Sequence, residues 1–515
     1  MKRSFLVILS ALFLILSFPD FNFEFLVWIG LVPLFFAIEG KTPSKAFLIS
    51  YLTGVLFFLG TIYWLVHVTL PGMIIVVLYL ALYFGLFGLI FAYSFRLTPF
   101  GLLISAPAVW VALELGRSKF LSGFGWALLA HSQSYNLPII QIADIVGAYG
   151  VSFLIVMVNA ALFLTIKNFK KRTYSLNYIM IALFLVFISL GYGIFRLNNI
   201  FAGEKLRVAI VQGNIPQAKK WDSNFEEEIL KKYEELTKQA AGLGADLIVW
   251  PETSVPGFLE SEQYLLNRLK ILIRSINTPL LVGTPAEDRN LRQTYYNSAI
   301  LFDADGAIID RYDKIHLVPF GEYIPAKFIF SFVEKFAPLP ISDFTNGRNY
   351  TIFRFFIERN AKDESFSWRL VKKVRFSTLI CFEDIFPDLT REFVKRDAMF
   401  LINITNDAWF KNTNAPYQHA QSSVFRAVEN RVNVVRAANT GLSCFIDQKG
   451  RIVSAVEAGG HNLFVDGFKI HEIVLTKTRT FYTVYGDIFA YLCSLFTIIF
   501  LLSVRHPHKF LSRLL

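Results

Sequence analysis

Residues 379–384 read Leu-Ile-Cys-Phe-Glu-Asp and place Cys381 at the end of an apolar run with the composition of a β-strand. Two other motifs share this layout. The motif Trp-Pro-Glu-Thr places Glu252 just past an apolar run, and Lys314 opens the motif Lys-Ile-His-Leu-Val-Pro-Phe-Gly-Glu. Reactive side chains that follow strands collect at the mouth of an α/β sheet, so we expect these three residues to meet there.

The block around these motifs, from about Leu206 to Lys477, alternates short β-rich runs with amphipathic helices, which is typical of an α/β domain. Hairpin turns are expected at 303–306 and 447–450. Predicted strands lie at 206–213, 245–251, 280–285, 297–302, 374–381, 398–404, 433–438 and 443–447, and predicted helices at 224–242, 260–276, 387–396 and 416–430.

Both flanks of this block are far more apolar than the block itself, and the chain as a whole is 54% hydrophobic. Apolar segments of helical length lie at 5–18, 23–38, 46–68, 73–93, 100–115, 150–166, 178–195 and 488–504. The first segment has a cleaved signal peptide as its alternative, but the missing small-residue cleavage site favours a retained helix. The sequence therefore predicts an α-helical membrane domain of about eight transmembrane helices, with residues 1–200 before a catalytic domain at 201–480 and the last helix and tail at 481–515.

Basic residues are distributed unequally between alternate loops, and Lys and Arg are retained on the cytoplasmic side. One set of loops holds only Arg117 and Lys119, whereas the other holds about twelve basic residues. Both termini are therefore predicted to be cytoplasmic and the α/β domain extracytoplasmic. The net charge of +11 is explained largely by these loops facing an anionic leaflet, so no nucleic-acid partner is expected.

The three cysteines, Cys381, Cys444 and Cys493, lie far apart and form no Cys-x-x-Cys pair. Neither a zinc site nor a disulfide framework is indicated, and we expect no metal or organic cofactor. Cys444 and Cys493 are interpreted as small buried residues. Together with Glu252 and Lys314, Cys381 suffices for acyl transfer, because a carboxylate can take the thiol proton, a thiolate can attack a carbonyl and an ammonium can offset the oxyanion charge.

Glu252, Lys314 and Cys381 in this order and setting resemble the nitrilase (carbon-nitrogen hydrolase) superfamily, whose fold is an αββα sandwich. The motifs around these three residues point to one family within this superfamily. They are Gly-Asn-Ile-Pro-Gln and Lys-Trp-Asp within 213–222, His-Leu-Val-Pro-Phe-Gly-Glu-Tyr-Ile-Pro at 316–325, and Asn-Asp-Ala-Trp-Phe at 406–410. With seven helices before the domain and one after it, the whole chain resembles the apolipoprotein N-acyltransferases of bacterial inner membranes.

That resemblance implies an enzyme of the bacterial cytoplasmic (inner) membrane with a periplasmic catalytic domain. Its members move an acyl chain from a phospholipid, typically phosphatidylethanolamine, through a thioester to the α-amine of a lipoprotein's diacylglyceryl-cysteine. By position in the motifs, the resemblance implies that Cys381 is the nucleophile, Glu252 the general base and Lys314 the stabiliser of the oxyanion. The supporting positions that the resemblance adds are Glu322, Glu383, Trp221 and Phe382, the last standing where many members have tyrosine.

Several of these residues have a plainer interpretation. Glu322 and Glu383 are equally compatible with orienting the lysine or the cysteine loop. His316, two residues after Lys314 in a β-like run, should be structural. We expect a surface or packing role for His419 and Arg426, which lie on a predicted helix.

Glu39 and Glu114 lie at or near the ends of predicted transmembrane helices, so they are interpreted as snorkelled or loop carboxylates. The apolar stretch 325–346 is compatible with a buried helix or with a lid that touches lipid. Two rival functions remain at this point: a membrane-tethered amidase with water as the acceptor, and a non-catalytic membrane scaffold.

Overall fold

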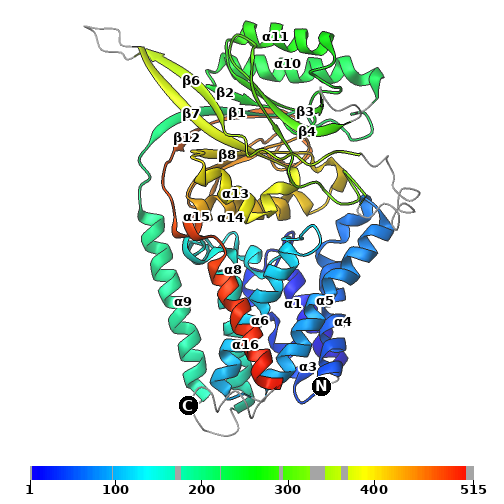
Figure 1. Ribbon diagram of the computed structural model, residues 1–515, viewed down its shortest axis with the longest axis vertical. Helices are drawn as coiled ribbons and strands as arrows, with labels where there is room; N and C mark the ends of the chain where they lie inside the picture. Colours follow the sequence, from blue (N-terminus) through cyan, green and yellow to red (C-terminus); the bar gives the residue numbers. More distant parts are fainter. Residues whose placement is uncertain are drawn as a thin grey trace. The chain divides into compact units, whose positions relative to one another are not determined.

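The computed structural model describes residues 3–95, 97–168, 175–220, 222–288, 294–324, 343–360 and 369–505. The chain divides into two compact units, one made of residues 1–199 and 484–515 and the other of residues 200–483 (Figure 1).

The first unit is helical, and all eight predicted apolar segments form helix within it. Its elements are α1 (Arg3–Leu16), η1 (Glu24–Leu26), α2 (Val27–Gly30), α3 (Val32–Ile38), α4 (Pro43–Thr61), η2 (Tyr63–His67), α5 (Leu70–Ser94), α6 (Pro99–Lys119), η3 (Leu129–Gln133), α7 (Leu137–Ile140), α8 (Ala143–Asn168), α9 (Ser175–Asn198) and α16 (Ile488–Arg505), with α15 (Phe481–Tyr485) at the boundary between the units. Among the described residues, α4, α5, α6, α8 and α9 are long and apolar enough to cross a membrane, whereas α1, the segment 24–38 and α16 are shorter.

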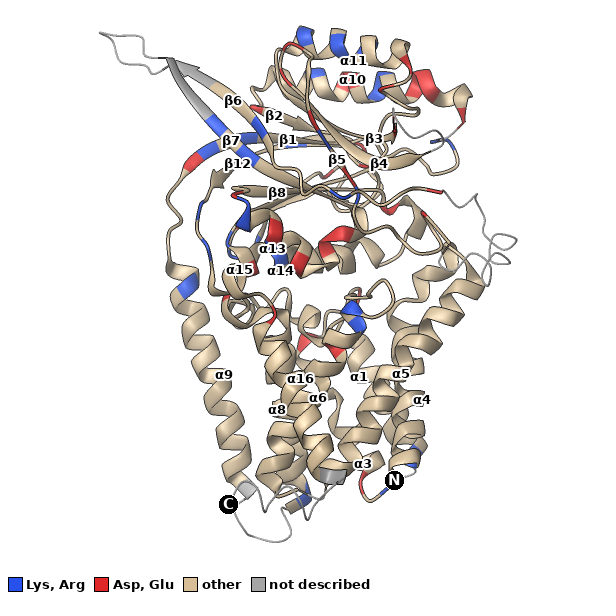
Figure 2. Ribbon diagram, in the orientation of Figure 1, with Lys and Arg blue, Asp and Glu red and all other residues tan. Residues whose placement is uncertain are grey.

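Charged residues in this unit gather near the helix ends and are largely missing from their middles (Figure 2). Some polar side chains that do lie inside are hydrogen-bonded to the backbone of a neighbouring helix. Asn159 of α8 donates to the Val27 carbonyl (2.9 Å) and accepts from the Leu31 N–H (2.8 Å), where α2 gives way to α3. Backbone groups at such a break need a partner in an apolar environment, and Asn159 supplies it.

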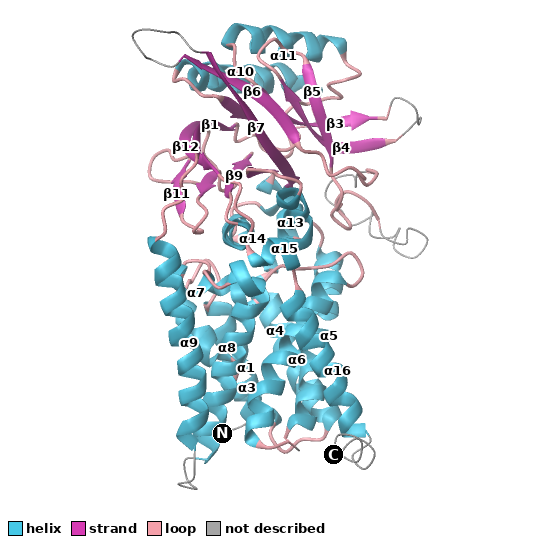
Figure 3. Ribbon diagram, turned by 60° about the vertical axis from the view of Figure 1, so that its left-hand side comes forward, coloured by secondary structure: helices cyan, strands magenta, loops and turns pink. Residues whose placement is uncertain are grey.

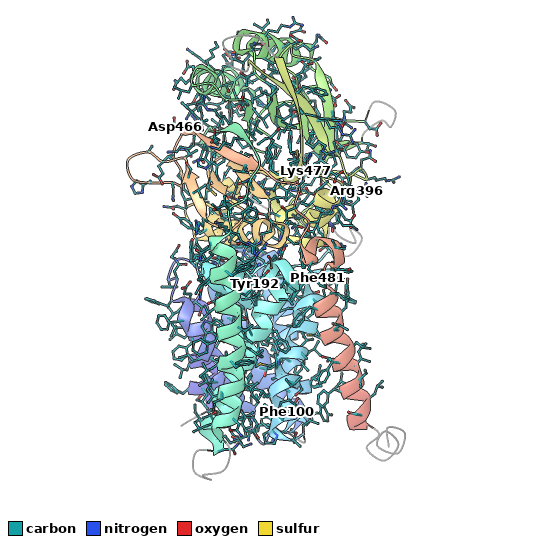
Figure 4. The ribbon with its side chains drawn as sticks, turned by 90° about the vertical axis from the view of Figure 1, so that its left-hand side faces the viewer. Phe100, Tyr192, Arg396, Asp466, Lys477 and Phe481 are labelled. Carbon is teal, nitrogen blue, oxygen red and sulfur yellow. The ribbon has the colours of Figure 1, made fainter. Side chains whose placement is uncertain are left out.

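Tyr192, labelled in Figure 4, donates from α9 to Asp144 of α8 at 2.8 Å, and Arg196 pairs with the same carboxylate at 3.0 Å. This polar contact ties the two helices together inside the helical unit.

Glu114 corrects one expectation. It is only 5% exposed, and its carboxylate accepts from the Leu129 N–H at 2.9 Å, while the neighbouring Arg117 donates to the carbonyls of Trp126 and Ala127. The two side chains hold the loop after α6 inside the unit, so the interpretation of Glu114 as a snorkelled or loop carboxylate is wrong. Glu39 pairs with Lys167 at 2.7 Å and is partly exposed.

The second unit contains two six-stranded sheets (Figure 3). In the first sheet the strand order is β12 (Gly467–Leu475), β1 (Glu204–Gln212), β2 (Leu247–Val249), β3 (Leu280–Glu287), β4 (Tyr295–Phe302) and β5 (Ile308–Asp313). In the second sheet it is β11 (Ile452–Ala455), β10 (Cys444–Ile446), β9 (Asn433–Ala438), β8 (Phe400–Thr405), β7 (Arg369–Ile380) and β6 (Phe353–Asn360). In both sheets the three parallel strands are linked through helices and followed by an antiparallel hairpin, although no repeat is visible in the sequence.

Four helices cover the two sheets from outside: α10 (Glu226–Gly242) and α11 (Gln263–Ile276) lie over the first sheet, and α13 (Pro387–Lys395) and α14 (Ala415–Asn430) over the second (Figure 1). Apolar residues of α10, α11 and strands β1 to β4 form one buried cluster. This is the αββα sandwich that the resemblance to the nitrilase superfamily implies. Strands β5 and β11 follow the two predicted hairpin turns, strands β6 and β12 were not predicted, and β7 begins five residues earlier than expected.

Candidate active site

Cys381 is the first residue after β7 and opens the short helical turn η7 (Cys381–Ile385). Its backbone lies in the left-handed region, with φ +53°, which costs a residue with a Cβ about 1–3 kcal/mol. Two side chains contact its carbonyl oxygen: the Asn403 amide donates at 3.0 Å, and His419 Nε2 lies at 3.2 Å. The polar contacts beneath the turn thus hold the cysteine in a conformation that it would not otherwise prefer.

Lys314 follows β5 directly and is fully buried. Its Nζ lies 2.8 Å from Glu322 Oε2 and 3.6 Å from Glu252 Oε1. The amide of Asn297 donates to both carboxylates, at 2.8 Å to Glu252 and 2.6 Å to Glu322. These four side chains form one polar group in which each carboxylate contacts both Lys314 and Asn297, and Glu322 also accepts from the Val318 N–H at 2.8 Å.

The charges of this group determine the protonation of its lysine. Burial by itself would lower the pKa of Lys314, but Glu322 and then Glu252 outweigh it and raise the pKa above its usual value. Lys314 is therefore a permanent ammonium at neutral pH, which suits it to face negative charge.

The thiol of Cys381 lies within electrostatic reach of both Glu252 and Lys314. Burial raises its pKa well above the usual value, and the negative charge of Glu252 adds to this, whereas Lys314 and a hydrogen bond with Thr405 act in the opposite direction. The resting sulfur is thus a neutral thiol, and it needs a base to become a nucleophile.

Glu383 connects the lysine loop with the cysteine turn. One carboxylate oxygen accepts from the Tyr312 hydroxyl (2.8 Å) and from the Ile315 and His316 N–H groups, and the other accepts from the Ile380 N–H at 2.8 Å. Burial raises the pKa of Glu383 to about 7 against the effect of these donors. Its contacts lie with the backbone on both sides of the site, so its geometry is that of a residue that positions two loops.

A second buried cluster lies under Cys381, and sequence reasoning missed it. His419 of α14 contacts Asp384 through Nε2 and Asp407 through Nδ1, both at 3.0 Å. Arg436 of β9 pairs with the same two carboxylates, at 3.1 and 3.2 Å. With both cations charged, the cluster of two carboxylates, a histidine and an arginine is electrically neutral.

His419 is 1% exposed, so a surface role for it is excluded. Burial and Arg436 would lower its pKa, but Asp384 and Asp407 raise the pKa above the usual value. The sequence signals were the two motifs that contain Asp384 and Asp407, because His419 and Arg436 lie on elements whose pairing the local pattern does not reveal.

Of the other residues singled out in the sequence, some are buried in packing contacts and some lie outside the described part of the chain. Phe382 is buried and meets Phe386 edge-on, with ring centroids 5.2 Å apart, and His316 stacks on the same Phe386 at 4.3 Å. Arg426 is buried and pairs with Glu429 at 2.9 Å. Trp221 and most of the apolar stretch 325–346 lie outside the described residues.

Two of the sequence motifs, at 213–217 and 406–410, lie close together near this site. Gln217 accepts a hydrogen bond from the Asn406 amide at 2.7 Å, and Asn439 contacts both Asn406 and the Ile215 carbonyl. These contacts join the loop after β1 to the ends of β8 and β9, so the first and second sheets each contribute to the surroundings of the site.

Comparison with known proteins identifies two family matches along the chain. Residues 10–161 match the apolipoprotein N-acyltransferase N-terminal domain, and residues 207–475 match the carbon-nitrogen hydrolase family. The apolipoprotein N-acyltransferase of Geobacter metallireducens is 40% identical and covers 96% of this chain and 93% of its own length. That of Chlorobaculum tepidum is 30% identical, with 96% of this chain and 94% of its own length covered.

Among solved structures, an amidase from Nesterenkonia sp. matches 57% of this chain and 97% of its own, with 18% identity and a TM-score of 0.37. The apolar helices and the relatives that match nearly the whole chain together show that this chain is a membrane protein. It belongs to the apolipoprotein N-acyltransferase family, which performs the final N-acylation step on lipoproteins.

Proposed function

We propose that the chain performs this N-acylation through a thioester on Cys381, with a phospholipid, phosphatidylethanolamine in the first place, as the acyl donor. The acceptor is the α-amine of the N-terminal diacylglyceryl-cysteine of a lipoprotein. The observation that carries the proposal is the group of Glu252, Lys314, Glu322 and Asn297 beside a partly buried thiol that needs a base.

In the first half-reaction, Glu252 takes the proton of Cys381 while the sulfur attacks the donor ester. The charge that develops on the carbonyl oxygen is offset by the Lys314 ammonium and by the backbone N–H of Phe382. The C–O bond then breaks, Glu252 returns the proton to the departing lysophospholipid, and the acyl chain remains on the sulfur. Glu322 keeps the ammonium of Lys314 in place throughout, and Glu383 holds the two loops together.

In the second half-reaction the acceptor amine attacks the thioester, a C–N bond forms and the C–S bond breaks. Glu252 carries a proton from the nitrogen to the departing thiolate, which restores the Cys381 thiol. Exclusion of water is essential, because hydrolysis of the thioester would release a free fatty acid in place of the amide.

Intact-mass spectrometry of the full-length protein tests both halves. After incubation with phosphatidylethanolamine, wild type is expected to gain the mass of one acyl group and Cys381→Ala none, because the alanine variant has no thiol to acylate. A diacylated lipopeptide should then discharge the adduct to an N-acyl product.

Other outcomes of this experiment would contradict the proposal. Discharge to free fatty acid despite the lipopeptide would favour the amidase, and no adduct on folded wild type would favour the scaffold. Cys444→Ala serves as the matched control, because Cys444 is a fully buried cysteine in β10 and should leave the adduct unchanged.

We propose further that both termini are cytoplasmic and that the catalytic unit faces the periplasm. The support is the uneven distribution of Lys and Arg between alternate loops. The exposed positions Ser44 and Ser261 offer matched reporters, the first among the basic residues of a predicted cytoplasmic loop and the second in the catalytic unit.

In a Cys381→Ala background, Ser261→Cys should react with a membrane-impermeant maleimide in intact spheroplasts. Ser44→Cys should react only after lysis, because the membrane shields a cytoplasmic thiol. The reverse pattern would invert the topology, and labelling of both in intact cells would contradict the membrane arrangement as a whole.

A further inference from the structure

Lys220 is a buried lysine near the site that the mechanism above does not use. It is 3% exposed, and its Nζ donates to the main-chain carbonyl of Glu252 at 2.9 Å. Glu252 therefore interacts with two lysines, with Lys314 through its carboxylate and with Lys220 through its carbonyl.

The two lysines differ in their counter-ions. Lys314 has Glu322 at 2.8 Å, whereas no carboxylate among the described residues forms an ion pair with Lys220. A buried ammonium without a paired carboxylate is costly, so the neutral amine is favoured at that position. Burial lowers the pKa of Lys220 to about 7, and the charges of Glu252 and Cys381 oppose this only in part.

The residues beside Lys220 in the chain have partners of their own. Lys219 lies 3.5 Å from Glu228, and Asp222 accepts from the Asn224 N–H at 3.0 Å. Among the described residues, the titratable groups that act on Lys220 are Glu252, which follows β2, and Cys381, which follows β7. Both belong to the reacting set.

Proton balance identifies a step that needs a second base. Acylation only passes the thiol proton through Glu252 to the leaving alcohol. An acceptor that arrives as an ammonium must lose two protons to become an amide N–H, one before attack, to free the lone pair, and one after attack. Glu252 holds one proton at a time and returns it to the Cys381 thiolate, so the other proton needs a different acceptor.

We propose that Lys220, in its neutral form, accepts the first proton of the incoming ammonium and releases it to solvent after the transfer. The inference rests on the thioester mechanism proposed above. It assigns Lys220 to the amine half-reaction alone, and a base whose pKa lies near the working pH suits that task.

The test separates the two half-reactions in full-length Lys220→Met, where methionine fills similar space without a base. Acyl-enzyme formation from phosphatidylethanolamine is expected to stay within about twofold of wild type, which also establishes that the variant is folded. Discharge of the isolated acyl-enzyme by a diacylated lipopeptide at pH 7 should fall by about six- to elevenfold, because only about one-sixth to one-eleventh of an α-amine with a pKa of about 7.7–8.0 is free base at this pH.

The dependence of the discharge rate on pH distinguishes the loss of a base from a structural disturbance of the site. In Lys220→Met, discharge should rise about tenfold per pH unit until the acceptor α-amine, with a pKa of about 7.7–8.0, is mostly free base. Wild type should show a flatter profile. Hydroxylamine, which is already neutral at pH 7, should discharge both proteins at equal rates.

Two further variants complete the design. Lys220→Arg stays protonated and should share the defect, whereas Lys219→Met removes the same charge from the neighbouring half-exposed position and should behave as wild type. Activity retained by Lys220→Arg, a deficit that is constant across pH, or an equal loss of acylation would overturn the assignment. Absence of the acyl-enzyme on wild type would instead overturn the thioester mechanism.

Discussion

Replacing Glu252 with glutamine is expected to slow formation of the acyl-enzyme by about 10²- to 10⁴-fold at neutral pH. The partly buried Cys381 thiol has a raised pKa and depends on a base for ionisation. Glutamine keeps the shape of the side chain and an oxygen that can accept from Asn297, while Glu322 still partners Lys314 at 2.8 Å. The loss should therefore reflect the missing base, and the rate of mass increase after mixing with phospholipid measures it.

Glu457→Gln provides the control for this experiment. Glu457 is an exposed carboxylate in the loop after β11, so the same chemical change there should leave acylation at the wild-type rate. If Glu252→Gln also acylated at the wild-type rate, Glu252 would not be the base, and another acceptor for the thiol proton would have to be identified.

Replacing Arg436 with methionine is expected to destabilise the catalytic unit by about 3–5 kcal/mol. The change leaves Asp384 and Asp407 buried with His419 as their remaining cation. It also removes the donor that Arg436 gives to Asn403 Oδ1 at 2.9 Å, and Asn403 in turn holds the Cys381 carbonyl. The stability loss should thus be accompanied by slower acylation, and thermal unfolding in detergent with the mass assay measures both.

Arg479→Met is the matched comparison for the buried pair. Arg479 also pairs with an aspartate, Asp397 at 3.0 Å, but both side chains are about half exposed. Solvent screens such a pair, so its loss should cost less than about 1 kcal/mol. Equal unfolding temperatures for the Arg436 and Arg479 variants would show that the cluster under Cys381 does not stabilise the protein.

The architecture was predictable because its signals are local. Long apolar segments specify membrane-length helices through composition alone, and short apolar runs bounded by turn residues specify the strands of the sandwich. The same patterns placed Glu252, Lys314 and Cys381 just past apolar runs, where side chains of different strands can converge. Strands β6 and β12 were missed because they pair at or beside sheet edges, where burial leaves a weaker alternation.

The contacts inside the site depended on tertiary structure. Tyr312 donates to Glu383 across 71 positions of sequence, and Arg436 reaches Asp384 across 52. The local sequence pattern does not predict such pairs, because a charged residue on a helix or strand gives the same pattern whether its side chain faces water or a buried partner. Local periodicity fixes which face of an element is apolar, whereas the packing of the elements decides which polar groups lose water and must therefore find one another.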